Sequence, residues 1–324
     1  MSTTVTLDVE TASRLDTFLT EHLGETRNQI AQLIKLGAVS VDGKSITKPG
    51  IKLKPGQSLH VTFPEIQSSQ PKPINFDVEI LYEDDHILVI NKPSALTVHP
   101  APSVHEATLV DWLIHKGIAL STISGEERHG IVHRLDKGTS GVMVVAKNNR
   151  AHEALSLQLQ DKSMGRYYLA VIAPPLKELL TTIESRVGRS PNNRLKMANV
   201  PHGKEAKTLF RRLLLSRDEK CELIGCKLFT GRTHQIRVHL ETISRHILGD
   251  HLYGVKSKDA KIERILLHAY ILYLRHPENG EILHFSAPLD DTMQRYMYKH
   301  FDQELLDALL SPNTFSNHFR SELL

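Results

Sequence analysis

The core of this chain is indicated by residues 140–173, "SGVMVVAKNNRAHEALSLQLQDKSMGRYYLAVIA". They have the pattern of a strand, a helix and a second strand. The apolar run at 140–147 and the β-branched and aromatic run at 167–173 are typical of strands. The segment between them, 148–161, has the apolar spacing of a helix. This stretch therefore predicts a core that mixes helix and sheet.

Further strands are expected on both sides of this stretch. "VEILYEDDHILVINKP" reads as two strands that turn at Asp84–Asp85, and two more are expected at 205–215 and 221–229. A second helix is expected at 233–244. Because strands and helices do not alternate regularly, the pattern predicts an α+β domain with a mixed, mainly antiparallel sheet, which we place at residues 77–295.

A smaller αβ domain is expected at residues 1–63. "RLDTFLTEHL" and "TRNQIAQLIKLG" predict two helices, and "AVSVDGKSI" predicts a hairpin that turns at Asp42–Gly43. Between residues 27 and 54 six basic residues stand against one acidic residue, Asp42: Arg27, Lys35, Lys44, Lys48, Lys52 and Lys54. They indicate a basic face, which either contacts a partner or is simply solvated.

Two remaining segments connect and end the chain. Three prolines and no apolar periodicity predict a linker at 64–76. Residues 296–324 predict a helical tail whose final stretch, "SPNTFSNHFRSELL", is loose.

Composition narrows the class of protein. The chain has 324 residues, 40% hydrophobic and 24% charged, with a formal net charge of +3, and it can bury a substantial core. The polar N-terminus does not look like a secretory signal, so we expect a cytoplasmic protein. Cys221 and Cys226 are too few for a disulfide framework and lack the paired spacing of a zinc site.

The stretch "HGIVHRLDKGTSGVMVVAK", residues 129–147, places Asp136 on a tight loop before the first core strand. Taken alone, it favours a structural aspartate that bonds to its own backbone over a catalytic one. A Ser140–His133–Asp136 hydrolase triad is disfavoured because all three lie in one short loop without a nucleophile elbow. A metal site at His129 and His133 is disfavoured because the residues between them argue against a helix.

Two distant stretches carry further candidates. "LFTGRTHQIRVHLETI" predicts a helix with Thr233 as its N-cap and with His234 and Arg237 on one face. In "GRYYLAVIAP", strand alternation places Tyr167 and Tyr168 on opposite faces, so one of them is interior or faces a cleft. Both candidates also have structural explanations that remain open. Arg237 could be a surface arginine whose aliphatic part packs on the protein, and the tyrosine could be an ordinary core residue.

Together these stretches resemble the large-subunit ribosomal RNA pseudouridine synthases of the RluA/RluD type over most of the chain. "HGIVHRLDKGTSGVMVVAK" looks like the family's H-R-L-D-x-x-T-S-G signature, "NKPSALTVHP" like its N-K-P-x-G-x-x-x-H-P block, and "TGRTHQIRVH" like its T-G-R-x-H-Q-I-R-x-H helix. "GDHLYG" and "LLHAYILYLRHP" follow in the family's order. One departure is Ala95, which stands where the family usually has glycine and must accept the same backbone angles.

The resemblance implies roles for single residues. The family's essential aspartate falls on Asp136, and the arginine that pairs with it falls on Arg237. The family's active-site tyrosine lies in a pattern of a basic residue, any residue, Tyr, any residue and Ala, which begins here at Arg166 and selects Tyr168. Substrate binding is implied for Arg134, Arg232, His234, Arg27 and Lys35. Residues 14–61, within the expected domain at 1–63, resemble a small RNA-binding domain first known from a small-subunit ribosomal protein.

The resemblance further implies an isomerase that turns uridine into pseudouridine without a cofactor or metal. Its partner would be RNA, chiefly large-subunit ribosomal RNA with transfer RNA as a second possibility, and we expect a monomer. Ionised Asp136 would attack the sugar or the base, or remove a sugar proton, and the sequence leaves these three roles open. The alternative function is a non-catalytic RNA-binding or ribosome-assembly factor.

Overall fold

The computed structural model describes residues 3–24, 27–63, 73–101, 104–121, 129–254 and 262–311, with 314, 315 and 319. The chain divides into two compact units, Met1–Pro71 and Lys72–Leu324, each with its own hydrophobic core. Most of the expected linker lies outside the described residues. No helix in the described part of the chain is long and apolar enough to cross a membrane.

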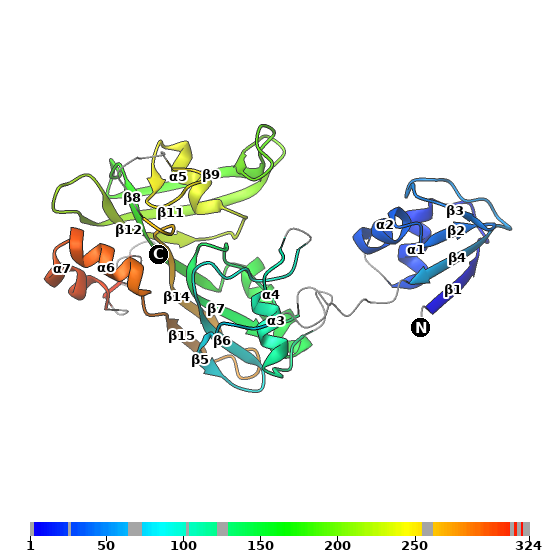
Figure 1. Ribbon diagram of the computed structural model, residues 1–324, viewed down its shortest axis with the longest axis horizontal. Coiled ribbons are helices and arrows are strands. Elements are labelled where there is room, and N and C mark those ends of the chain that lie inside the picture. The colour runs from blue at the N-terminus through cyan, green and yellow to red at the C-terminus, as the bar shows by residue number, and fades with distance from the viewer. Residues whose placement is uncertain are drawn as a thin grey trace. The chain divides into compact units, whose positions relative to one another are not determined.

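The N-terminal unit packs two helices against an antiparallel sheet (Figure 1). Its elements are β1 Thr3–Asp8, α1 Leu15–Leu23, α2 Arg27–Lys35, β2 Val39–Val41, β3 Lys44–Ser45 and β4 Ser58–Phe63, with strand order β1-β4-β2-β3. The β2–β3 hairpin turns at Asp42 and Gly43, both with positive φ, as the Asp-Gly pair predicts. The expected small αβ unit is therefore present.

The larger unit is built on one long mixed sheet (Figure 1). Its elements are β5 Glu79–Glu83, β6 Ile87–Lys92, α3 Leu109–His115, β7 Ser140–Ala146, α4 Asn149–Gln160, β8 Gly165–Ala173, β9 Leu180–Arg189, β10 Met197–Asn199, β11 Lys204–Leu215, β12 Glu222–Leu228, α5 Gln235–Thr242, β13 His246–Ile247, β14 Leu267–Arg275, β15 Ile282–Ser286, α6 Asp291–His300 and α7 Gln303–Leu309. The strand order is β10-β9-β11-β12-β8-β14-β7-β6-β5, with β13 beside β8 and β15 beside β14. Within the described residues every strand pairing is antiparallel except that of β14 with β7, which confirms the expected fold class.

The centre of this sheet is buried on both faces. Every residue of β7 and β12 is buried, which explains why these strands read as continuous apolar runs rather than alternating ones. Gly141 allows β7 and β14 to meet, because a Cβ atom at this position would lie 2.1 Å from the backbone oxygen of Ala269. The middle of the sheet is therefore a rigid base for the loops at its edges.

The C-terminal segment differs from the expected loose end. Helix α6 spans residue 296 and buries Met293 and Met297, and beyond α7 the side chains of Phe315 and Phe319 are buried in the main core. Their rings lie 6.4 and 5.0 Å from that of Tyr167. The aromatic residues in "SPNTFSNHF" were the signal for this packing, and the polar residues around them concealed it.

Candidate active site

Asp136 lies on the loop that leads into β7. The loop is closed by a bond from the Thr139 amide to the Asp136 backbone oxygen, 3.0 Å long, so it is a tight turn as expected. The carboxylate does not cap this turn. Its Oδ2 instead accepts a hydrogen bond of 3.3 Å from Nη1 of Arg237, which lies 101 residues further along the chain. Nε2 of His234 lies 3.8 Å from the same oxygen.

Arg237 projects from α5 and is held mainly by a second carboxylate, that of Asp250. Its Nε and Nη2 donate to the two oxygens of Asp250 at 2.7 and 2.9 Å. The ring of Tyr253 lies 4.7 Å from the guanidinium carbon. This fork leaves Nη1 directed at Asp136, so Asp250 aims the arginine.

Asp250 was not predicted as a site residue, although "GDHLYG" was recognised as a block. Its side chain is 1% exposed and also accepts the backbone amides of Leu252 and Tyr253, each at 3.0 Å. Burial tends to raise the pKa of Asp250, but the hydrogen bonds and charge of Arg237 outweigh it and lower the pKa. Asp250 is therefore an ionised carboxylate behind the site.

The start of α5 differs from the expected N-cap at Thr233. His234 occupies the cap position with φ of 56° and makes no capping bond, and the helix begins at Gln235. The Gln235 side chain serves the loop instead, since its Oε1 accepts from the amide of Arg232 at 3.0 Å and from the Thr230 hydroxyl at 2.7 Å. The strained turn directs the His234 ring toward the Tyr253 hydroxyl, 2.9 Å away, and toward Asp136.

Tyr168 comes from β8 in the centre of the sheet and lines the same pocket as Asp136. Burial raises the pKa of its hydroxyl to about 12, and nearby Arg166 counteracts this rise. Tyr167 lies on the opposite face, in contact with the aromatic rings of the C-terminal segment. The alternation expected along this strand thus separates a pocket tyrosine from a core tyrosine.

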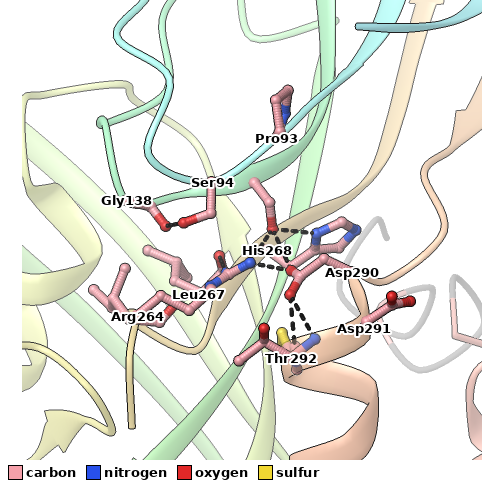
Figure 2. Close-up of polar contacts among 12 residues, drawn as sticks. Pro93, Ser94, Gly138, Arg264, Leu267, His268, Asp290, Asp291 and Thr292 are labelled. Atoms are coloured by element: carbon pink, nitrogen blue, oxygen red, sulfur yellow. Dashed lines mark hydrogen bonds and ion pairs between the residues drawn. The ribbon is translucent and has the colours of Figure 1, made fainter. Parts of the chain in front are cut away.

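A clamp from the β6–α3 segment holds the Asp136 loop in place. The Ser94 hydroxyl donates to the Gly138 oxygen at 2.9 Å, as Figure 2 shows. Lys92 is fully buried, and its amine donates to the oxygens of Pro93 and Leu96, at 2.7 and 2.9 Å, and more weakly to that of Lys137. Burial lowers the pKa of Lys92 to about 7. Ala95, which lies in the same segment, has φ of 67°. This is the left-handed conformation expected at a position where the family usually has glycine.

A second anchor holds the end of the same loop, where β7 begins. The Ser140 hydroxyl lies 2.8 Å from His268 Nδ1 and accepts from Arg264 at 2.9 Å. Arg264 also forms an ion pair with Asp290, the N-cap of α6, and Figure 2 shows Arg264, His268 and Asp290 gathered there. Ser140 is therefore engaged away from Asp136.

His133 lies away from the residues with which it could form a hydrolase triad. His133 Nε2 accepts the amide of Val144 at 3.2 Å inside the core, so His133 does not meet Ser140 in a triad. Among the residues that the structure describes, no group of three His, Cys, Asp or Glu side chains could hold a metal ion.

The remaining candidates fall into two groups. Arg134, Arg232 and His234 line the pocket with Asp136, Tyr168 and Arg237. Arg27 and Lys35 belong instead to the N-terminal unit. Lys35 is exposed at the end of α2, and the side chain of Arg27 lies outside the described residues.

Comparison with known proteins gives this geometry its context. Residues 86–242 match the family model described as RNA pseudouridylate synthase, and residues 13–59 match the S4 domain. An uncharacterized RNA pseudouridine synthase of Helicobacter pylori strain J99 is 45% identical over 94% of this chain and 95% of its own length. A Zymomonas mobilis protein named ribosomal large subunit pseudouridine synthase D is 37% identical, over 83% of this chain and 87% of its own.

A solved structure has a similar fold. Human RNA Pseudouridylate Synthase Domain Containing 1 superposes with a TM-score of 0.57 at 23% identity, over 73% of this chain and 95% of that one. At this identity the likeness concerns the fold alone.

Proposed function

The chain belongs to the RNA pseudouridylate synthase family, and from this membership we propose that it isomerises specific uridines of large-subunit ribosomal RNA, with ionised Asp136 as its central group and no cofactor. One observation carries the proposal. The carboxylate of Asp136 accepts a hydrogen bond from Arg237, and both lie in a pocket that is also lined by Tyr168 and by further arginines. The name of the Zymomonas mobilis relative favours ribosomal RNA over transfer RNA. We also propose that the protein acts in the cytoplasm as a monomer.

The reaction breaks the bond between C1′ of the sugar and N1 of uracil, turns the base, and joins C1′ to C5. Asp136 can attack C1′, add to the base, or take a sugar proton, and each role needs the ionised form. Arg237 orients the carboxylate, because Nη1 of its permanently charged guanidinium donates a hydrogen bond to it.

The target base must leave its helix before Asp136 can reach it. Extruding a nucleotide costs a few kcal/mol, which contacts in the pocket must offset. Arg134 is exposed beside His99, and Arg232, whose Nε donates to the Glu205 oxygen at 2.9 Å, is partly buried. We assign Arg134, Arg232 and His234 to the RNA around the flipped uridine.

Changing Tyr168 to phenylalanine should slow product formation by about 10²-fold while RNA affinity stays near that of the wild type. The ring still stacks on the base, a contact worth roughly 1–3 kcal/mol, whereas the hydroxyl that helps to remove the C5 proton is gone. Rapid-quench kinetics and a binding titration on the same RNA measure the two effects. An equal loss of affinity and rate would reduce Tyr168 to a packing residue.

Removal of residues 1–62 should weaken RNA binding and flatten its dependence on salt. For single-stranded RNA, each neutralised phosphate contributes about 0.7 to the slope of log K against log salt, so contacts by the basic face, with Arg27 and Lys35, add to that slope. Affinity measured at several salt concentrations for both proteins gives the difference. If the two slopes coincide, the basic face of the N-terminal unit is only solvated.

Two experiments test the proposed function itself. Release of tritium from RNA labelled at uridine C5 separates an isomerase from the alternative RNA-binding factor, which would bind without release. Mapping pseudouridine in a strain that lacks the gene should then reveal a missing site in large-subunit ribosomal RNA. A missing site in transfer RNA alone would retain the activity and overturn the assigned target.

A further inference from the structure

Arg166 is a buried arginine in the wall of the pocket that contains Asp136. None of the roles proposed for the other pocket residues involves it. It lies two residues before Tyr168 on β8, hence on the same face of the strand. The residue is 8% exposed, and its Nε is buried without a hydrogen-bond partner in the described part of the chain. Among the described residues no carboxylate forms an ion pair with Arg166 either.

The backbone around Arg166 is shaped to hold the guanidinium in this position. A Cβ atom at Gly231 would lie 2.5 Å from Nη1, so only glycine leaves room for the guanidinium against the loop before α5. Both Arg166 and Gly231 line the pocket that contains Asp136 and Tyr168. The space that glycine leaves is therefore part of the site.

The pocket around Arg166 has an excess of positive charge, which bears on the role of this arginine. Four arginines line the wall, Arg134, Arg166, Arg232 and Arg237, with Asp136 as the carboxylate among the lining residues. A buried charge without a partner is destabilising, so its presence points to a negative charge that is formed in the pocket when the substrate reacts. Exposed Arg134 can meet phosphates from the rim, whereas Arg166 lies deeper, beside the tyrosine on which the base stacks.

The reaction proposed above produces such a group inside the pocket. When the C1′–N1 bond breaks, its electron pair stays on N1, and the charge spreads to O2 and O4 of uracil. C1′ meanwhile bonds to an oxygen of Asp136, or Asp136 takes the C2′ proton. We propose that Arg166 is a further catalytic residue, which binds the uracil carbonyl oxygens and stabilises the detached uracil anion. This role rests on the proposed isomerase activity and deepens it.

Arg166→Gln should lower the single-turnover rate by about 10²- to 10³-fold, the range seen when one preorganised donor to a developing anion is removed. RNA affinity should change by less than about threefold, because the charge that Arg166 meets exists only during the reaction. Arg275→Gln is the matched control, since Arg275 is an exposed arginine on the neighbouring strand β14. Thermal melting of both variants verifies that they are folded.

Two further measurements separate this role from a structural one. Gly231→Ala keeps the charge but displaces the guanidinium, so it should share the rate defect without loss of fold. An RNA with 5-fluorouridine at the target site offers a better-stabilised anion, and the effect of Arg166→Gln on its glycosidic cleavage, followed by nuclease digestion and chromatography, should be about tenfold smaller.

Several outcomes would overturn the assignment. A large loss of affinity with an unchanged rate would make Arg166 a phosphate contact, and an equal rate loss with both nucleosides would make it a structural residue. Wild-type protein that releases no tritium would refute the isomerase itself, whereas an active wild type with an equally active Arg166→Gln variant would refute only the role of Arg166.

Discussion

Replacing Asp136 with asparagine should abolish pseudouridine formation, by at least about 10⁴-fold, while the protein stays folded. Asparagine keeps the shape of the side chain but cannot attack carbon or take a proton as a carboxylate does. The fold should survive because the Asp136 side chain is 19% exposed and its bond to Arg237 is the longest of the three that this arginine makes to carboxylates. Arg237 retains its fork with Asp250, so we expect a loss of unfolding free energy of no more than about 1 kcal/mol.

Chemical mapping of pseudouridine after long incubation at high enzyme concentration measures this loss. Asp85→Asn is a suitable control, because Asp85 is exposed in the β5–β6 turn of the same unit. Turnover by purified Asp136→Asn protein within tenfold of the wild type would remove Asp136 from the mechanism.

Replacing Arg237 with alanine should damage both the rate and the fold. Its removal leaves Asp250 charged and 1% exposed with two backbone amides as its remaining partners, a cost on the order of 3–5 kcal/mol. The same change releases Asp136 from its oriented position. Unlike Asp136→Asn, this variant should therefore unfold at a clearly lower urea concentration as well as lose activity.

The double variant Arg237→Ala/Asp250→Asn isolates the origin of the instability. If uncompensated charge is the cause, removing it should restore part of the stability lost in Arg237→Ala, as urea titrations of a double-mutant cycle would measure. Because the folded-state pKa of Asp250 is lowered, the pair stabilises the wild type above the usual carboxyl range near 4, and this contribution is lost as the pH falls below it. A double variant less stable than Arg237→Ala would show that the cavity, not the charge, dominates.

Local sequence patterns predicted most of the fold. The turn at Asp42–Gly43 follows from local chemistry, and so does the helix α4 between β7 and β8. The predicted cap at Thr233 was wrong, because His234 occupies the cap position and the side chain of Gln235, the first residue of α5, accepts from the Thr230 hydroxyl and the Arg232 amide in the preceding loop. The aromatic residues near the C-terminus hint at packing, but the partner of Phe315, Tyr167, lies more than 140 residues away and cannot be identified from the local pattern.

Motifs in the sequence marked part of the candidate site, but they did not mark Asp250, whose carboxylate binds Arg237. Asp136, Tyr168 and Arg237 stood in recognisable blocks, and the structure places them around one pocket. Asp250 follows α5 by several residues, and only the folded chain returns it to Arg237. That Arg166 has no carboxylate partner among the described residues likewise appears only once its neighbours in the fold are known.

The role of Asp136 in isomerisation is tested by comparing tritium release and RNA binding in the wild type and Asp136→Asn. The substrate is large-subunit ribosomal RNA that carries tritium at uridine C5 and comes from cells without the gene. We expect both proteins to bind this RNA with similar affinity and only the wild type to release tritium. Binding without release by the wild type, or equal release by both proteins, would contradict this expectation.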